Sequence, residues 1–322
     1  MTERDARTIV VTGAAGFIGS HVSEALIARG DSVIGLDNFD PYYDPAIKRR
    51  NITDLQASDR FRLIEGDIRD AADVEEAFAA GPVDGVIHLA ARAGVRPSIE
   101  QPIEYATTNV EGTVVMLEAA RRHEVGRFVF GSSSSVYGAA NTVPFAEDQR
   151  IDQPISPYAA TKVAGEALCY TWHHLYDLPV IALRFFTVIG PRQRPDLAIN
   201  KFVRLLENDE TIPQFGDGSS SRDYTYVADI ARGILAALDS DYGYEVINLG
   251  GSSPIRLDEM IAAVGEAVGV EPRVDILDDQ PGDVPRTSAD VTRAKELLDW
   301  EPQWTLAEGL REFVAWYRRM NA

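Results

Sequence analysis

A serine, a tyrosine and a lysine stand at spacings that suit proton transfer from a hydroxyl group. Tyr158 and Lys162 are four residues apart, so in a helix they share one face. A lysine ammonium beside a phenol lowers the pKa of the phenol, which then acts as a base nearer neutral pH. Ser133 lies in a run of four serines and can hold the same substrate oxygen. Such a pair is often only a surface pair, so the interpretation depends on the elements that position it.

A glycine-rich turn near the start of the chain predicts a site for a dinucleotide. Gly13 permits a tight turn, Gly16 lets the backbone approach a pyrophosphate, and Gly19 lets a helix pack closely on a strand. The helix that follows presents free N–H groups to the anion. Asp37, which stands 18 residues after Gly19, suits the two ribose hydroxyls and would repel a 2′-phosphate. These residues favour NAD over NADP.

Apolar and amphipathic stretches alternate through the first half of the chain. This alternation predicts an α/β fold with a doubly wound parallel sheet, covered by helices on both faces. The expected strands are residues 8–11, 32–37, 61–65, 85–88, 128–132 and 180–185. The expected helices are residues 20–29, 73–80 and 107–123. After the expected strand over 61–65 come Asp67 and Ile68, which would flank the adenine. After the strand over 85–88 come Leu89, Ala90 and Ala91, which would lie under the nicotinamide half.

The second half of the chain is richer in proline, glycine and aspartate. The expected helices there are residues 226–238, 256–268, 291–298 and 305–319, and a strand over residues 246–249 is expected to return to the main sheet. We therefore expect an NAD-binding domain over residues 1–190 with a return around 226–249. Residues 191–322 are expected to form a smaller α/β substrate lobe over the carboxyl edge of the sheet.

Composition narrows the class of protein. The 322 residues carry a net charge of −19, which argues against nucleic acid and anionic membrane as partners. Only four of the 31 basic residues are lysine. Either adaptation to high salt or the composition of a GC-rich genome accounts for this acidic, lysine-poor composition.

No apolar run approaches the ~18 residues of a membrane helix. Charged residues 1–7 run straight into a strand, so no signal peptide is expected, and the single Cys169 allows no internal disulfide. We expect a cytoplasmic protein.

Other reactive residue types have simpler interpretations. His173 and His174 are neighbours in a helix and cannot face one site together, and no metal site is expected. Cys169 is expected to pack in the core rather than act as a nucleophile. Arg192 and Arg194 are either surface charges or, near the predicted cleft, contacts for phosphate or ribose.

The order of these motifs resembles the extended short-chain dehydrogenase/reductase family. The motifs are GxxGxxG, a strand-end Asp, HLAA, SSSxxYG and YxxxK, and the similarity continues through residues 221–224 and 282–284. Within the family the chain is most similar to the nucleotide-sugar 4-epimerases. Residues 36–45, 93–96 and 184–188 are similar to UDP-glucuronate 4-epimerases, whereas UDP-glucose 4-epimerases usually carry Asn in place of Thr187.

The resemblance implies NAD-dependent C4 epimerisation of a UDP-sugar through a 4-keto intermediate, with tightly bound NAD and with UDP-glucuronate converted to UDP-galacturonate. The alternatives are a UDP-glucose/UDP-galactose 4-epimerase and a nucleotide-sugar dehydratase or decarboxylase. The catalytic residues implied are Ser133, Tyr158 and Lys162. The cofactor site implied consists of Gly13, Gly16, Phe17, Ile18, Gly19, Asp37, Asn38, Asp67, Ile68, Leu89, Ala90, Ala91, Ala93, Thr108, Tyr158 and Lys162. The substrate contacts implied are Arg96, Ser133, Ser134, Ser135, Thr187, Arg194, Arg222 and Arg286.

Two positions depart from the pattern: Ile189 stands where the subgroup usually has Tyr, and Gln280 where galactose epimerases have an arginine for the diphosphate. The resemblance also implies a homodimer, because in this family two helices of each subunit form a four-helix bundle. The helices would be residues 107–123 and 158–176. The apolar positions suited to that surface are Val110, Val114, Leu117, Ala164, Leu168 and Trp172.

Overall fold

The computed structural model describes residues 6–79, 81–139, 141–278 and 285–321. The first five residues, Ala80, Gln280 and the stretch 282–284, which entered the sequence analysis, lie outside the described residues. Within the described ranges, no helix combines the length and the apolarity needed to cross a bilayer.

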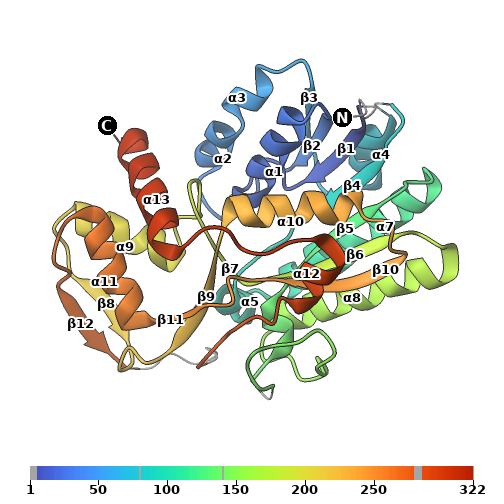
Figure 1. The fold of residues 1–322 in the computed structure, drawn as a ribbon. Coiled ribbons are helices and arrows are strands. Elements are labelled where there is room, and N and C mark those ends of the chain that lie inside the picture. The colour runs from blue at the N-terminus through green and yellow to red at the C-terminus, as the bar shows by residue number, and fades with distance from the viewer. Residues whose placement is uncertain (1–5, 80, 140, 279–284, 322) are drawn as a thin grey trace.

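A seven-stranded parallel sheet forms the centre of the molecule, as the alternation of apolar and amphipathic stretches predicted (Figure 1). Its strand order is β10-β6-β5-β4-β1-β2-β3. The strands are β1 (Thr8–Thr12), β2 (Ser32–Asp37), β3 (Phe61–Glu65), β4 (Gly85–His88), β5 (Phe128–Ser133), β6 (Val180–Phe185) and β10 (Tyr244–Leu249). The return of β10 to pair with β6 was predicted and is confirmed. All seven carboxyl ends therefore meet at one edge, where open α/β sheets bind ligands.

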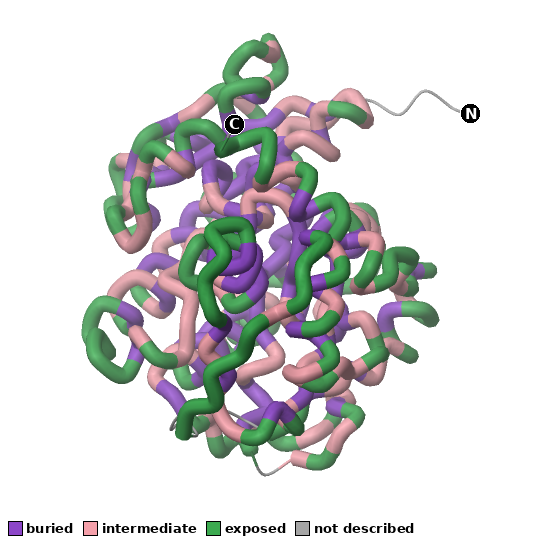
Figure 2. Tube along the Cα trace, turned by 90° about the vertical axis from the view of Figure 1, so that its left-hand side faces the viewer, coloured by how far each residue is buried: buried purple, intermediate pink, exposed green. Residues whose placement is uncertain are grey.

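Helices cover both faces of this sheet. One face carries α1 (Phe17–Ala28) and α10 (Val227–Asp239), and the other carries α4 (Ala71–Ala79), α7 (Gly112–Arg122) and α8 (Pro157–Tyr176). Alternate residues of β1 enter the two cores, since Ile9 and Val11 pack on the first face and Val10 on the second. The buried segments gather along the middle of the molecule (Figure 2). Burial on both sides explains why the strand sequences are almost continuously apolar.

A smaller lobe follows β6 and covers the carboxyl edge. Its strands form a three-stranded sheet, β11-β9-β7, and a two-stranded sheet, β12-β8. Its elements are β7 (Thr187–Ile189), α9 (Ala198–Glu207), β8 (Ile212–Phe215), β9 (Ser221–Tyr226), β11 (Pro254–Arg256), α11 (Leu257–Val268), β12 (Val274–Leu277) and α13 (Leu306–Asn321), whereas α12 (Thr292–Leu298) packs against α10 and β10. The predicted helices correspond to α10, α11, α12 and α13. The short strands of the lobe and α9 were not predicted.

Short helices lie in the loops that surround the carboxyl edge. They are α2 (Pro45–Asn51), α3 (Thr53–Gln56), α5 (Val95–Glu100), α6 (Pro102–Ala106) and the 3-10 turn η2 (Ser134–Tyr137). The predicted helix over 107–123 is present, but its first part is a π-helix, η1 (Thr107–Glu111), which precedes α7. There the Thr113 hydroxyl donates to the Asn109 carbonyl at 2.6 Å, and the Asn109 side chain pairs with the backbone of Arg92. These bonds, made to a distant segment, accompany the widened turn.

One residue expected on the dimer surface is not there. Leu117 of α7 is fully buried against the sheet, because its position on the helix faces the core that also holds Met116 and Cys169. Val110, Val114, Ala164, Leu168 and Trp172 are partly exposed.

Candidate active site

A cavity of about 490 Å³ opens at the carboxyl edge of the main sheet. Strand ends and the loops after β1, β2, β3, β4, β5 and β6 supply its walls. This is the position and the size expected of a ligand site in an open α/β fold. Among the described residues, none after Leu197 lines the cavity.

The glycine turn after β1 has the geometry that the sequence predicted. Gly13 has φ +68°, and a Cβ there would meet the Ala90 nitrogen at 2.9 Å. A Cβ on Gly19 would lie 2.1 Å from the Gly13 carbonyl oxygen, so only glycine allows the helix to pack this closely. Gly16 is the N-cap of α1 and contributes no side chain. The first N–H groups of the helix are therefore free to bind an anion.

Asp37 at the end of β2 is buried and faces the same cavity. Its carboxylate accepts hydrogen bonds from Ala15 N at 3.0 Å and Phe39 N at 2.9 Å. Burial raises the pKa of Asp37, whereas the nearby Lys48 ammonium and these two N–H groups lower it. Lys48 lines the cavity too, and burial lowers its pKa. The two groups form a polar end of the cavity suited to ribose hydroxyls.

Most other residues assigned to the cofactor line the cavity, and one does not. The residues that line it are Phe17, Ile18, Asn38, Ile68, Leu89, Ala90, Ala91, Ala93 and Thr108. The side chain of Asp67 lies outside the wall, because it binds Arg69 at 2.7 Å and Asn38 at 3.0 Å. The hydrogen bond from Arg69 lowers the pKa of Asp67 to about 2.

A buried histidine fixes the loop after β4. The Thr12 hydroxyl accepts from the amides of Leu89 and Ala90 at 3.1 and 3.0 Å, so its own proton points to His88 Nδ1 at 2.8 Å. His88 Nε2 must then carry a proton and donate to Thr113 at 3.1 Å. Burial lowers the pKa of His88 to about 3, which keeps it neutral. This network holds the backbone that forms the cavity floor.

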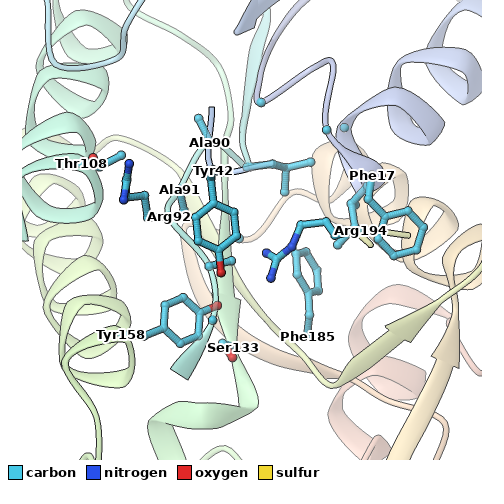
Figure 3. A pocket seen from close by; sticks show the side chains of 18 of the residues that line it. Phe17, Tyr42, Ala90, Ala91, Arg92, Thr108, Ser133, Tyr158, Phe185 and Arg194 are labelled. Atoms are coloured by element: carbon cyan, nitrogen blue, oxygen red, sulfur yellow. The ribbon is translucent and has the colours of Figure 1, made fainter. Parts of the chain in front are cut away.

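Tyr158 and Ser133 lie close together at the other end of the cavity (Figure 3). Lys162 lines the same cavity. Ser133 ends β5, and the two other residues lie on the first turns of α8, which begins at Pro157 with Ser156 as its cap. The Ser133 hydroxyl is close enough to the phenol to lower the pKa of Tyr158. The spacing of the three residues in the sequence thus corresponds to one cluster in space.

The expectation that Lys162 lowers the pKa of Tyr158 is wrong for this structure. Burial raises the pKa of Tyr158, and the groups that oppose this shift are Ser133 and Arg194. The Lys162 ammonium instead donates to the Gly131 carbonyl at 2.7 Å. Burial lowers the pKa of Lys162 to about 8. The Lys162 ammonium therefore bonds to the backbone of β5 and not to the phenol of Tyr158.

Four of the residues assigned to substrate, besides Ser133, line the reactive end. They are Ser134, Ser135, Thr187 and Arg194. The Arg194 guanidinium pairs with Asp196 at 2.8 Å and lies over the Tyr42 ring, 5.2 Å from its centroid. The acids that line the described cavity are Asp37 and Asp40, both from β2 and the loop after it. The reactive end is therefore rich in hydroxyl groups and carries an arginine.

Three arginines assigned to substrate are not in the cavity wall. Arg96 in α5 lies over the ring of Phe215, 5.7 Å from its centroid. Arg222 in β9 donates to the Ser221 carbonyl at 3.0 Å, and the exposed Arg286 forms a β-bridge with Ser221. None of the three therefore lines this cavity, and their assignment to the substrate stays a prediction.

The family model described as GDP-mannose 4,6 dehydratase matches residues 10–313. The chain belongs to this family. Its members are extended short-chain dehydrogenases/reductases, as the motifs indicated. Among curated relatives, UDP-glucuronate 4-epimerase of Thermodesulfobacterium geofontis is 42% identical over 308 residues, covering 95% of each chain.

Two solved structures of extended short-chain dehydrogenases/reductases show the same fold. UDP-glucuronic acid 4-epimerase from Bacillus cereus, in complex with UDP-glucuronic acid and NAD, has a TM-score of 0.92 at 36% identity and covers 97% of this chain and 99% of its own. UDP-glucose 4-epimerase from Thermotoga maritima, with UDP-glucose, has a TM-score of 0.91 at 33% identity and covers 98% of this chain and 100% of its own. The predicted fold class is confirmed.

Sequence reasoning did not assign several residues of the cavity wall. They are Asp40, Tyr42, Tyr43, Lys48, Arg92, Phe185, Phe186 and Val188. Most lie inside the stretches that carried the resemblance, residues 36–45 and 184–188. The sequence therefore indicated these segments as functional without indicating the individual residues. It did not distinguish which side chains face inward.

Cys169 and Arg192 follow the simpler of their two interpretations. Cys169 is buried in the core of the α8 face, and burial raises the pKa of its thiol. Arg192 pairs with Glu24 and lies outside the cavity wall. In the part of the chain that the structure describes, no cluster of three or more histidine, cysteine, aspartate or glutamate residues could hold a metal ion.

Proposed function

We propose that this protein is an NAD-dependent UDP-sugar 4-epimerase whose preferred reaction converts UDP-glucuronate to UDP-galacturonate. One observation carries the proposal: a tyrosine base with a serine in reach lies in the same cavity as a glycine turn and a ribose-binding aspartate. The similarity to NAD-bound UDP-sugar epimerases supports the same reaction. A dehydratase or a decarboxylase would be expected to carry an acid beside Ser133, where this chain has Ser134 and Ser135.

The cavity fits NAD. Gly13 and Gly19 let the turn and α1 pack closely on the neighbouring backbone, Gly16 leaves the N-cap of α1 without a side chain, and Asp37 keeps two oxygens near the ribose position. NAD, when bound, supplies the reversible oxidation of C4, so the reaction consumes none. In this proposal residues 1–190, with the return at 226–249, hold the cofactor tightly.

The chain's own residues then move one proton. Tyr158 removes the proton of the 4-hydroxyl as C4 becomes a ketone, and returns it once the sugar has turned about its diphosphate. Ser133 holds the same oxygen. Because burial raises the pKa of Tyr158, a positive charge near the phenol is needed for it to act as a base, and Arg194 and Lys162 are the cations that line this end.

A uronate makes a further demand on the site. The 4-ketone is β to the C5 carboxylate, so the C5–C6 bond can break with loss of carbon dioxide, leaving its electron pair on an enolate that takes up a proton. That bond breaks readily only when it is perpendicular to the carbonyl plane. We assign Ser134, Ser135 and Thr187 to hold the carboxylate out of that orientation, supported by a wall that is rich in hydroxyls here.

The uridine diphosphate is assigned to the lobe, residues 191–322. Arg286 forms a β-bridge with Ser221, the residue before Arg222 in β9. In a chain of net charge −19, we assign each of these two arginines to the diphosphate as a local positive charge. Arg96 is assigned to the same ligand from its resemblance alone.

A homodimer through α7 and α8 is part of the proposal. Five of the six expected apolar positions on these helices are partly exposed, and Ile103 and Leu175 nearby are exposed by 77% and 59%. Leu168→Arg is expected to lower the mass in solution, and Ile276→Arg, on the remote β12, is its control. A monomeric wild type at micromolar concentration would exclude the dimer.

We assign the protein to the cytoplasm, where a lone cysteine stays reduced.

The deciding experiment compares two substrates. Wild type is incubated separately with UDP-glucuronate and UDP-glucose, and the products are separated and identified. UDP-galacturonate should form faster than UDP-galactose, and denatured protein should release stoichiometric nicotinamide that was never added. Preference for UDP-glucose would replace the uronate assignment with a UDP-glucose 4-epimerase, and absence of bound nicotinamide would contradict the epimerase proposal itself.

A further inference from the structure

A buried ion pair lies directly behind the reactive end of the cavity. Glu166 of α8 and Arg184 of β6 have side chains exposed by only 5% and 3%. Arg184 donates to both carboxylate oxygens, through Nε at 2.9 Å and Nη2 at 2.7 Å. The Ser132 hydroxyl donates to the same carboxylate at 2.5 Å. A charged side chain of the catalytic helix is thus joined to two strands of the sheet.

The strand partners of this pair lie in one row across the sheet. Ser132 of β5 is paired in register with Arg184 of β6, which is paired with Asn248 of β10. Tyr137 closes the row, because its hydroxyl accepts from Arg184 at 2.9 Å and donates to Asn248 at 2.7 Å. The row therefore connects three neighbouring strands and the turn after β5.

The next residue along two of these strands lines the cavity. Ser133 follows Ser132, and Phe185 follows Arg184, with Thr187 two residues further on. On α8, Glu166 stands one helical turn after Lys162 and two turns after Tyr158. The ion pair thus lies where the helix that carries the base meets the strands that carry the substrate-binding hydroxyls.

Stability alone does not explain such a pair. Removing two charges from water costs as much as their attraction returns, and replacing a buried pair by apolar residues of similar volume is often neutral or stabilising. What the bidentate bond adds is fixed geometry, since a planar guanidinium and a carboxylate meet in one orientation. A hydrophobic contact between helix and sheet would allow small shifts.

We propose that Glu166 and Arg184 are positioning residues that hold the Tyr158–Lys162 turn in register with Ser133 and Thr187. The inference rests on the proposed epimerase function. The pair touches neither sugar nor cofactor. It sets the separation between the phenol of Tyr158 and the hydroxyl of Ser133, the two groups that share the C4 oxygen. A misplacement of about 1 Å in such a pair costs a rate on the order of a hundredfold.

The test replaces the pair by apolar residues of similar length. Glu166→Met/Arg184→Met should fold, retain its NAD and melt no lower than wild type, whereas kcat should fall at least about tenfold with KM within about twofold of wild type. A purely structural pair would leave kcat unchanged in this folded variant. Wild-type kcat in the double variant would therefore overturn the proposal.

Arg184→Lys gives an independent answer if the double variant does not fold. It keeps a cation opposite Glu166 but loses the two-point bond, so kcat should fall with bound NAD and thermal midpoint unchanged. Unchanged kcat in Arg184→Lys would also contradict the proposal. Asp31→Asn/Arg29→Gln removes another pair, at the opposite end of the strands, and is expected to keep kcat.

The same assays separate this inference from the proposed function. Wild type that holds NAD but epimerises no UDP-sugar would refute the function. Active wild type with fully active pair variants would refute only the positioning role.

Discussion

The cavity wall and the C-terminal lobe prepare their polar groups in different ways. Asp37 and Lys162 are buried in the wall and His88 is buried outside it, and each already has hydrogen-bond partners from the backbone or a neighbouring side chain. Arg222 and Arg286 of the lobe are partly or fully exposed and lie outside the wall. A cofactor that stays bound suits the first arrangement. A sugar that must turn about its diphosphate suits the second, because only its tether has to be held.

The physical origin of this difference is the sheet. Seven parallel strands, most of them buried on both faces, bring their carboxyl ends to one edge with little freedom, so the groups there are fixed by the core. The lobe's strands are short, and β12 is exposed along its whole length. We therefore expect that chemistry in the wall and diphosphate binding in the lobe can be changed separately, and four changes test this separation.

The largest effect is expected from Tyr158→Phe. It removes the group assigned to take the C4 proton, and general acid–base catalysis is typically worth about 10²–10⁴-fold, so turnover should fall by at least that much. Bound NAD should remain, because Gly13, Asp37 and Lys162 are unaltered. Turnover and nicotinamide content of the purified variant are the measurements. Loss of NAD together with activity would show that NAD binding and catalysis cannot be separated in the wall.

Much of this wall could be predicted from the sequence. The strands were predicted because they are buried on both faces, and Gly13, Asp37, Ser133 and Tyr158 stand directly at strand or helix ends. Their positions follow from parallel topology alone.

Other features depend on contacts that a linear pattern does not contain. Lys48 and Tyr42 were missed because a loop after β2 brings them over the cavity. The π-helical turn accompanies bonds between Asn109 and the distant Arg92. The raised pKa of Tyr158 depends on the depth of burial, and the position of Arg222 on how the lobe packs.

The next effect in size is expected from Thr187→Val. The substitution keeps the shape but removes one donor to the carboxylate, a charge-assisted bond worth roughly 1.5–3 kcal/mol, or about ten- to hundredfold in rate. Turnover of UDP-glucuronate should fall and a decarboxylated 4-keto pentose should appear, both measured by product separation. Thr211→Val, exposed in the lobe, is the matched control. Unaltered turnover of UDP-glucuronate would remove the carboxylate assignment and leave the Tyr158 mechanism intact.

A smaller effect is expected from Arg222→Gln in the lobe. Losing one charged contact to the diphosphate should raise KM for the UDP-sugar about tenfold, equivalent to ~1.4 kcal/mol, with kcat and bound NAD unchanged. Arg256→Gln is the control, because Arg256 lies on the neighbouring β11 and is paired with Asp258 at 2.7 Å. A fall in kcat without a change in KM would contradict the division between wall and lobe.

The smallest effect concerns a property shared by both regions, the net charge of −19. Like charges on the surface repel one another, and the Debye length falls from about 10 Å at 0.1 M salt to about 3 Å at 1 M. If the acidic surface is an adaptation to high salt, the melting temperature should rise by several degrees over this range. Bound NAD and kcat should change less, since the charges of the wall are buried and screened weakly. A flat or falling melting temperature, followed by calorimetry, would leave genome composition as the source of the charge. A kcat that falls steeply with salt would show that the wall is not shielded from the surface field, and the contrast between the two regions would then not hold.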